Sequence, residues 1–281
     1  ASEEQSPGPV AAWSFDEGQG TTAYDSTSNS NNGTLTNGPV WKNESDCISG
    51  KCLYFDGSND YISVADNSLL NPINNSFTAS VWLRPNGLQA AQTGIFSKNN
   101  GDYYIFEINS SNLIAYEIRD NSGAGNYFSG NGNNSLNNNQ WNHVSWVLDR
   151  TNQNIYLYLN GKLDKTISIS TMDEDINPSG GALNIGRHTG YFKGSIDEPR
   201  IYPYARTAAQ IRADRNICSQ AELDRVVDFF PNELLQLARI GGQVAPPALE
   251  RIPIAMLGNL KRIQVDAHDV CMANLTNPLE D

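Results

Sequence analysis

The sequence has little positive charge and no long apolar run. Its 281 residues include 19 Lys and Arg against 31 Asp and Glu, so the net charge is −12. This balance argues against nucleic acid as a partner, because phosphate-binding surfaces need clustered Lys and Arg. No apolar run approaches the roughly 18 to 20 residues of a membrane span, and the chain starts Ala1-Ser2-Glu3-Glu4 rather than with a basic and then apolar leader. We therefore expect a processed, soluble product with no membrane span.

Cysteine is scarce but even in number. Cys47 and Cys52 enclose only four residues, whereas Cys218 and Cys271 flank the C-terminal part of the chain. An even count in a chain rich in turn residues favours two disulfides, one within each of these pairs. Disulfides also indicate an oxidising compartment, so we expect an extracellular or cell-surface protein. Four reduced thiols are the alternative, and the absence of a paired Cys-x-x-Cys argues against zinc.

Asparagine is abundant, with 34 residues, of which 30 precede Ile217. Asn tolerates the left-handed backbone region and is typical of turns and loops. Six asparagines stand in Asn-x-Ser/Thr sequons, which makes them candidate glycosylation sites. These are Asn32, Asn43, Asn74, Asn109, Asn133 and Asn274.

The composition changes near residue 216, because 24 of the 26 aromatic residues precede that point. We expect a flexible segment over 1–9, a folded domain over 10–216 and a small, mainly helical segment over 217–281. In the folded domain, short apolar runs alternate with Gly, Asn and Ser clusters, which predicts an all-β antiparallel sandwich. The predicted strands are 10–15, 51–55, 61–64, 77–83, 103–108, 113–118, 143–148, 155–159, 167–169 and 196–202.

Two local signals refine this prediction. Asn160-Gly161 follows the apolar run 155–159 and supplies the two positive φ angles of a type I′ turn, which predicts a β-hairpin. In the C-terminal segment, Ser219 and Glu222 form a capping box ahead of apolar residues at helical spacing.

Seven motifs follow one another along the first three quarters of the chain. They are VAAWSFDEG at 10–18, DSTSNSNNGT at 25–34, GKCLYFDGSNDY at 50–61, FTASVWLRP at 77–85, QWNHV at 140–144, YLNGK at 158–162 and FKGSIDEPRIY at 192–202. With these motifs, residues 10–216 resemble the laminin G-like jelly-roll family of the concanavalin A-like lectin/glucanase superfamily. The resemblance implies a two-sheet jelly roll whose first and last strands are neighbours, in a secreted or cell-surface module that binds glycans or proteins or serves structurally. The segment from 217 onward resembles no family.

Glycosidases of the same superfamily carry a Glu-x-Asp-x-Glu strand, in which alternation places two carboxylates on one face. No such strand is present. The run 173–175 lacks a flanking strand pattern, and the adjacent Asp197 and Glu198 are expected to point to opposite faces. A Gly-x-Ser-x-Gly elbow and a His-Glu-x-x-His helix are absent as well. We therefore predict a protein that is not an enzyme, and we interpret His143 as a structural residue.

A structural calcium ion is predicted where the first and last strands meet, because hard cations prefer several oxygen ligands. If those strands are neighbours, Asp16 and Asp197 converge, and the loop that carries Asp25 and Asn31 can wrap the same point. The resemblance agrees, since related jelly rolls often hold calcium in this region. In the alternative, the loop is a solvated turn and Asp197 caps backbone amides.

The loops at the rim of the sandwich are the predicted binding surface. Tyr127 and Phe128 in a Gly/Asn-rich loop, and Arg187, His188 and Tyr191 in a late loop, combine aromatic faces for sugar rings with polar groups for hydroxyls. We predict a non-catalytic binding or adhesion module for a glycan, a neutral one given the acidic surface, or for an extracellular protein. The alternative is a structural subunit of an extracellular layer or filament, which self-associates through the C-terminal segment.

Overall fold

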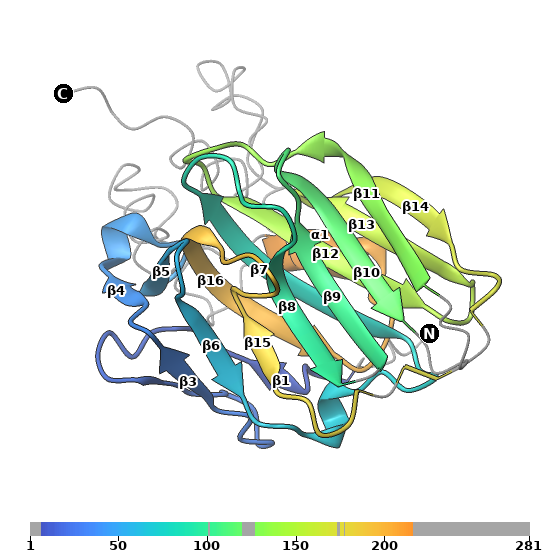
Figure 1. The fold of residues 1–281 in the computed structure, drawn as a ribbon, viewed down its shortest axis with the longest axis horizontal. Helices are drawn as coiled ribbons and strands as arrows, with labels where there is room; N and C mark the ends of the chain where they lie inside the picture. The colour runs from blue at the N-terminus through green and yellow to red at the C-terminus, as the bar shows by residue number, and fades with distance from the viewer. Residues whose placement is uncertain (1–6, 101, 120–126, 173–174, 177, 216–281) are drawn as a thin grey trace, which may run out of the picture. The chain divides into compact units, whose positions relative to one another are not determined.

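The computed structural model describes residues 7–100, 102–119, 127–172, 175–176 and 178–215. They form two eight-stranded antiparallel sheets that stack face to face (Figure 1). The all-β sandwich predicted from the sequence is confirmed. The predictions for segment 217–281 concern residues outside the described ranges, including Cys218, Cys271 and Asn274. The domain boundary near 216 also stays a prediction. No helix in the described ranges is long and apolar enough to cross a membrane.

Sheet A runs in the order β14-β13-β12-β7-β16-β5-β4, and β1 pairs with β16 beside this path. Its strands are β1 (Ala11–Ala12), β4 (Val40–Lys42), β5 (Cys52–Asp56), β7 (Phe77–Pro85), β12 (Asn142–Asp149), β13 (Asn154–Leu159), β14 (Lys162–Ser168) and β16 (Lys193–Tyr202). The pairing of β1 with β16 makes the first and last strands neighbours, as the resemblance implied.

Sheet B runs in the order β11-β10-β9-β8-β15-β6-β3-β2. Its strands are β2 (Thr22–Ala23), β3 (Gly33–Thr36), β6 (Tyr61–Val64), β8 (Thr93–Asn100), β9 (Asp102–Ile108), β10 (Leu113–Arg119), β11 (Tyr127–Ser135) and β15 (Leu183–Ile185). Three short helices complete the described structure: η1 (Glu44–Asp46), η2 (Ser68–Leu70) and α1 (Ala208–Arg215).

The core lies between the sheets and follows the two-residue period of the strands. Val81 on β7 and Val144 on β12 face inward and are fully buried. Trp146 stacks on Phe106 of sheet B, with ring centres 5.5 Å apart, and its indole N–H donates to the Ala115 carbonyl at 2.8 Å. Large aromatic side chains therefore join the two sheets, and the one polar atom of Trp146 has a partner.

The outer face of sheet A is also covered. On β7, Thr78, Ser80 and Trp82 alternate with the core residues and yet are buried. One cover is α1, whose Ile211 packs with Val147 and Tyr158. The other cover is the loop closed by the disulfide, described below. Alternation places these residues on the outside of the sheet, but the chain folds back over them.

The hairpin at Asn160-Gly161 is confirmed. It joins β13 to β14, and the two turn residues have φ angles of 51° and 73°. Asn and Gly adopt this left-handed region at low cost, so the turn follows from local chemistry.

Two predicted elements need correction. The strand predicted over 10–15 is only β1, because Phe15 has a φ of 56° and Trp13 makes an isolated bridge with Asp25. The Gly/Asn-rich loop assigned to Tyr127 and Phe128 is instead the beginning of edge strand β11. Its pairing with β10 imposes an extended backbone on residues of low strand propensity.

Candidate functional site

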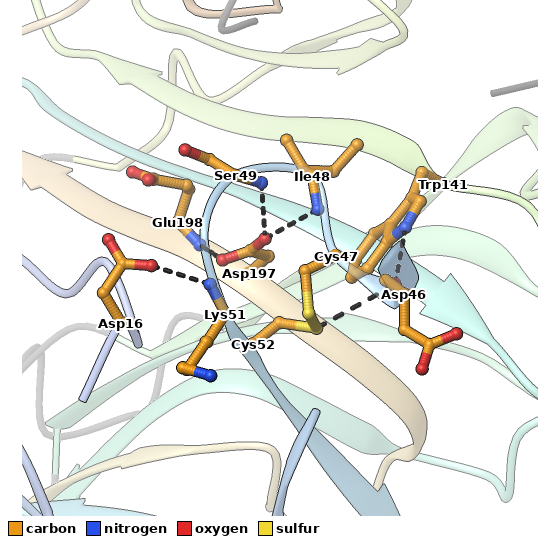
Figure 2. Close-up of a disulfide and its surroundings, with 10 residues drawn as sticks. All are labelled: Asp16, Asp46, Cys47, Ile48, Ser49, Lys51, Cys52, Trp141, Asp197 and Glu198. Carbon is orange, nitrogen blue, oxygen red and sulfur yellow. Dashed lines mark hydrogen bonds between the residues drawn. A yellow bond between two sulfur atoms is a disulfide. The ribbon is translucent and has the colours of Figure 1, made fainter. Parts of the chain in front are cut away.

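Cys47 and Cys52 form the predicted disulfide, with Cα atoms 5.5 Å apart. We call residues 47–52 the disulfide loop (Figure 2). Gly50 in this loop has a φ of 52°, and a Cβ at this position would lie 1.9 Å from the Asp16 Oδ1 atom. The loop therefore needs glycine for both its backbone conformation and its close approach to Asp16.

Asp197 holds the disulfide loop from below (Figure 2). Its side chain is fully buried, and Oδ2 accepts hydrogen bonds from the backbone N–H groups of Ile48 at 2.9 Å and Ser49 at 3.2 Å. Oδ1 accepts one from Glu198 at 2.9 Å. Burial, and next the charge of Glu198, raises the pKa of Asp197 well above its usual range, while the three N–H donors lower it. The Asp16 Oδ1 atom also contacts this loop, because it accepts a hydrogen bond from the Lys51 backbone N–H at 2.7 Å.

Asp25 organises a second loop, next to β1. Its Oδ1 accepts from the backbone N–H groups of Ala12 and Thr27, both at 3.0 Å. Its Oδ2 accepts from the Asn31 N–H at 2.8 Å and from the Thr27 hydroxyl at 2.9 Å. The Asn31 amide group in turn donates to the Val10 carbonyl at 3.0 Å. These side chains take the place of backbone partners in an irregular segment.

The four residues predicted to bind calcium thus belong to two groups. Asp16 and Asp197 each accept hydrogen bonds from the disulfide loop, whereas Asp25 accepts one from Asn31. Both oxygens of Asp25 and of Asp197 accept hydrogen bonds from within the chain, so these oxygens fit a cation poorly as they are arranged. Among the described residues, no group of three or more His, Cys, Asp and Glu side chains is placed to hold a metal ion. Next to Asp16 in the sequence, the buried Oε2 atom of Glu17 has no hydrogen-bond partner among the described residues. The calcium site stays a prediction.

The structure brings together Arg187 and Tyr191 from the predicted late loop and adds Tyr61 at the start of β6. The Arg187 guanidinium carbon lies 4.7 Å from the centre of the Tyr61 ring and 5.8 Å from that of Tyr191. The two ring centres are 6.5 Å apart. We call these three residues the Arg187 cluster. All three are half-buried, and the guanidinium donates no hydrogen bond to any described residue.

Sheet pairing explains why the cluster forms. β15 pairs with β6 through Ile185 and Ile62, so the residues just after β15 lie beside Tyr61. Arg187 and Tyr191 then face each other across a β-bridge. Gly190 ties the loop to the start of β8 through a β-bridge with Thr93 and an N–H that donates to the Gln92 carbonyl at 3.0 Å. The loop is held at both ends, so Arg187 is presented on a rigid support.

His188 lies against Glu107 of β9, with its Nδ1 atom 3.7 Å from the carboxylate Oε2. Glu107 and Glu117 share the outer face of sheet B, since Glu107 is opposite Ala115 on the neighbouring strand. The sequence pattern did not indicate the pair Glu107 and Glu117, because these two carboxylates come from neighbouring strands and not from one strand. The Glu107 Oε2 and His188 Nδ1 atoms are both closed off from solvent, and the Glu117 Oε1 accepts a hydrogen bond from Gln92.

Tyr127 and Phe128 do not join the Arg187 cluster. Strands β10, β9, β8 and β15 separate their strand, β11, from β6. Phe128 packs against the core, whereas 52% of Tyr127 is exposed. The five predicted binding residues therefore lie at two separate places. Only those of the late loop form a cluster.

The five sequons within the described residues are at least partly accessible to solvent. Asn32, Asn43, Asn74 and Asn133 are exposed, and Asn109 is half-buried. The Asn133 amide donates to the Asp164 carbonyl at 2.6 Å. Glycosylation stays a prediction at each position.

Residues 56–212, more than half of the chain, match the family described as the Concanavalin A-like lectin/glucanases superfamily. The chain belongs to this family. Among curated proteins, it is similar to the non-toxic nonhemagglutinin type D of Clostridium botulinum D phage, with 29% identity over 124 residues. That stretch covers 43% of this chain and 10% of the relative.

Solved structures share the fold at low sequence identity. The binding domain of Paraclostridial Mosquitocidal Protein 1 matches 74% of this chain and 52% of its own, with a TM-score of 0.62 and 16% identity. Domain 4 of AbnA, a GH43 extracellular arabinanase from Geobacillus stearothermophilus solved with arabinotriose, matches 74% of this chain and 98% of its own, with a TM-score of 0.58 and 22% identity. A binding domain of botulinum neurotoxin DC, solved with rat synaptotagmin II, has a TM-score of 0.53 and 16% identity over 74% of this chain and 51% of its own.

Proposed function

We propose that this chain is a non-catalytic binding module of an extracellular protein and that it recognises a neutral glycan through the Arg187 cluster. The observation that carries the proposal is the arrangement of Arg187 itself. Its guanidinium lies between two tyrosine rings and has no hydrogen-bond acceptor among the described residues. A guanidinium presents five N–H donors in a fixed plane, so a ligand with paired oxygen atoms fits it.

The tyrosine rings add the second element of sugar recognition. Each ring offers an apolar face for the C–H surface of a sugar and a hydroxyl for its polar edge. Cation–π contacts hold the guanidinium in place and reduce the entropy lost when a ligand binds. A neutral sugar suits a chain of net charge −12, because such a chain repels polyanions at a distance.

The comparisons support a binding role. The arabinanase domain was solved with a neutral oligosaccharide, and this chain covers almost all of it. The neurotoxin domain was solved with a protein, so a protein is the alternative ligand that the experiment must distinguish from a glycan. The Cys47–Cys52 disulfide is consistent with a location outside the cell.

A catalytic role is less well supported by the carboxylates. Glycoside hydrolysis needs two carboxyl groups that both reach the scissile bond. The Glu107 Oε2 atom is closed off from solvent, and Glu117 is hydrogen-bonded to Gln92. Turnover of a polysaccharide that is lost in Glu107→Gln would contradict the proposal.

The proposal is tested by isothermal titration with arabinotriose and by a glycan array that covers other neutral sugars. We expect the best glycan to bind Arg187→Gln and Tyr191→Ala at least tenfold more weakly than the wild type. Arg119→Gln removes the same charge from the exposed end of β10 and is the matched control, with unchanged affinity. Binding of a surface protein that carries no glycan would show that the ligand is a protein and not a sugar. Concentration-dependent assembly without either ligand would favour the structural alternative.

A further inference from the structure

A second polar surface lies on the outer face of sheet A, beside the disulfide loop. It is a hollow of about 190 Å³, and we call it the Arg84 hollow. Ser195 on β16 forms its centre, with Arg84 opposite on β7 and Tyr54 opposite on β5. Lys42 of β4 and Asp46 of η1 line the side next to the disulfide loop. Three neighbouring strands therefore form a rigid floor.

The hollow contains two cations with N–H donors that form no hydrogen bond within the described chain. Arg84 donates from Nε to the Asn139 carbonyl at 3.2 Å, and its two terminal nitrogens bond to no described residue. The Lys42 ammonium lies 4.8 Å from the centre of the Tyr54 ring and forms no ion pair among the described residues. Asp46 is the one acidic residue lining the hollow, so two positive charges and one negative give a local charge of +1.

The surrounding groups are held in place. The backbone N–H of Asn139 donates to the Pro85 carbonyl at 2.8 Å, and that of Asn86 donates to the Lys193 carbonyl at 2.9 Å. The Asn86 amide also donates to the Tyr54 hydroxyl at 3.2 Å. Because these groups are already ordered, a ligand would lose little affinity to ordering them.

We propose that the Arg84 hollow binds a uronate, a sugar unit that carries a carboxylate. Arg84 and Lys42 would bind the carboxylate, since charge-assisted hydrogen bonds from guanidinium and ammonium groups are the strong ones. The Ser195 hydroxyl, the Asn139 amide and the Asp46 carboxylate would bind ring hydroxyls. The hollow is smaller than the roughly 300 to 1,000 Å³ of pockets for drug-sized ligands, so it suits one terminal unit rather than a long chain.

This site is separate from the Arg187 cluster, which lies on sheet B. A terminal uronate on a short oligosaccharide meets less repulsion than a long polyanion, because long-range repulsion from a net charge of −12 grows with the charge of the ligand. The two sites would allow one module to recognise a glycan that contains both neutral and acidic sugars.

The test is isothermal titration of the full chain with trigalacturonate and with its methyl ester, which has the same rings without the negative charges. We expect the ester to bind at least tenfold more weakly than the acid. Arg84→Gln and, as a second variant, Lys42→Gln should each lower the affinity for the acid at least tenfold with an unchanged thermal melt. Arg119→Gln should leave it unchanged. Saturating arabinotriose should not displace the acid.

Four results would overturn the proposal. The first is equal binding of the acid and its ester. The second is an equal loss in Arg119→Gln and Arg84→Gln, which would indicate a general charge effect. The third is displacement of the acid by arabinotriose, which would show that both ligands share one site. The fourth is binding of poly-glutamate in preference to trigalacturonate, which would show a site for acidic peptides instead of sugars.

Discussion

Asp197 and Arg187 are both ionisable residues, but Asp197 lies on β16 in the interior of sheet A, whereas Arg187 lies in the loop after β15 of sheet B. Asp197 is fully buried on sheet A, and three backbone N–H groups point at its carboxylate. Arg187 is half-buried beside sheet B, and within the described chain its donors have only two aromatic faces as neighbours. A buried charge must find its partners within the fold, whereas a half-exposed charge without an acceptor can offer its bonds to a ligand. We therefore expect Asp197 to act in stability, and this contrast supports the proposal that Arg187 acts in binding.

The largest expected effect on stability comes from replacing Asp197. Asp197→Ala leaves three backbone donors without their acceptor, two of them in the disulfide loop. Unsatisfied buried groups cost about 1 to 3 kcal/mol each, and partial entry of water reduces the sum, so we expect a loss of about 3 kcal/mol in the free energy of unfolding. Urea denaturation measures it.

Two variants serve as controls for that experiment. Asp197→Asn keeps the volume and one acceptor oxygen and should lose less stability than the alanine variant. Asp16→Ala removes the exposed carboxylate that contacts the same loop through Lys51 and should lose much less. Equal losses in Asp16→Ala and Asp197→Ala would show that burial is not the deciding factor.

His143 gives the next effect, which depends on pH. It is buried against Trp82 on the outer face of sheet A. Burial, with smaller contributions from Arg200, Arg215 and Arg206, lowers its pKa to about 3. A lowered histidine pKa contributes stability above the unfolded value of about 6.5 that is lost as pH falls. Between pH 7.5 and pH 4.5 we therefore expect this group to lower the free energy of unfolding by about 3 kcal/mol.

Urea denaturation at the two pH values checks this prediction in His143→Gln, which should lose less stability in acid than the wild type. Asp214 on α1 is the matched control with the opposite sign. Burial raises its pKa to about 6, against the lowering effect of Arg206 and Arg200. Its contribution is present below about pH 3.8 and lost as pH rises through 6, so Asp214→Asn should steepen the acid loss. The same pH dependence in wild type and His143→Gln would refute the assignment.

The smallest expected effect concerns calcium. If a calcium ion binds near Asp16 and Asp25, a free concentration of ten times the dissociation constant adds about 1.4 kcal/mol to the free energy of unfolding. The melting temperature should then fall when a chelator is added and recover with excess calcium. Because intrachain donors already hold the Asp25 oxygens, Asp25→Asn would distinguish a metal ligand from a structural acceptor. An unchanged melt and no metal by elemental analysis would refute the site.

The parts of the fold that follow from local chemistry could be predicted from the sequence. The Asn160-Gly161 hairpin rests on two residues that accept positive φ angles, and the Cys47–Cys52 pairing rests on a short spacing. Strand β11 was missed because its Gly and Asn residues have low strand propensity, and only pairing with β10 makes them extended. Helix α1 was missed because its packing through Ile211 on sheet A depends on tertiary structure.

The same distinction applies to the candidate sites. Arg187, His188 and Tyr191 share one loop, so the sequence could indicate them together. Tyr61 could not be added, because only the pairing of β15 with β6 brings it to that loop. The Arg84 hollow was missed for the same reason, since its residues come from separate strands of sheet A. Pairing between distant strands carries no signal in the spacing of residues.

The most direct test of the central claim is an NMR titration of the isotope-labelled chain with arabinotriose, which follows arginine Nε–H groups, tyrosine rings and backbone amides together. We predict shifts of the Arg187 Nε–H signal and of the Tyr61 and Tyr191 ring signals, with the Ile48 and Ser49 amides of the disulfide loop unchanged. Shifts confined to the disulfide loop, or no shift at the Arg187 cluster with any glycan that the chain binds, would contradict the account.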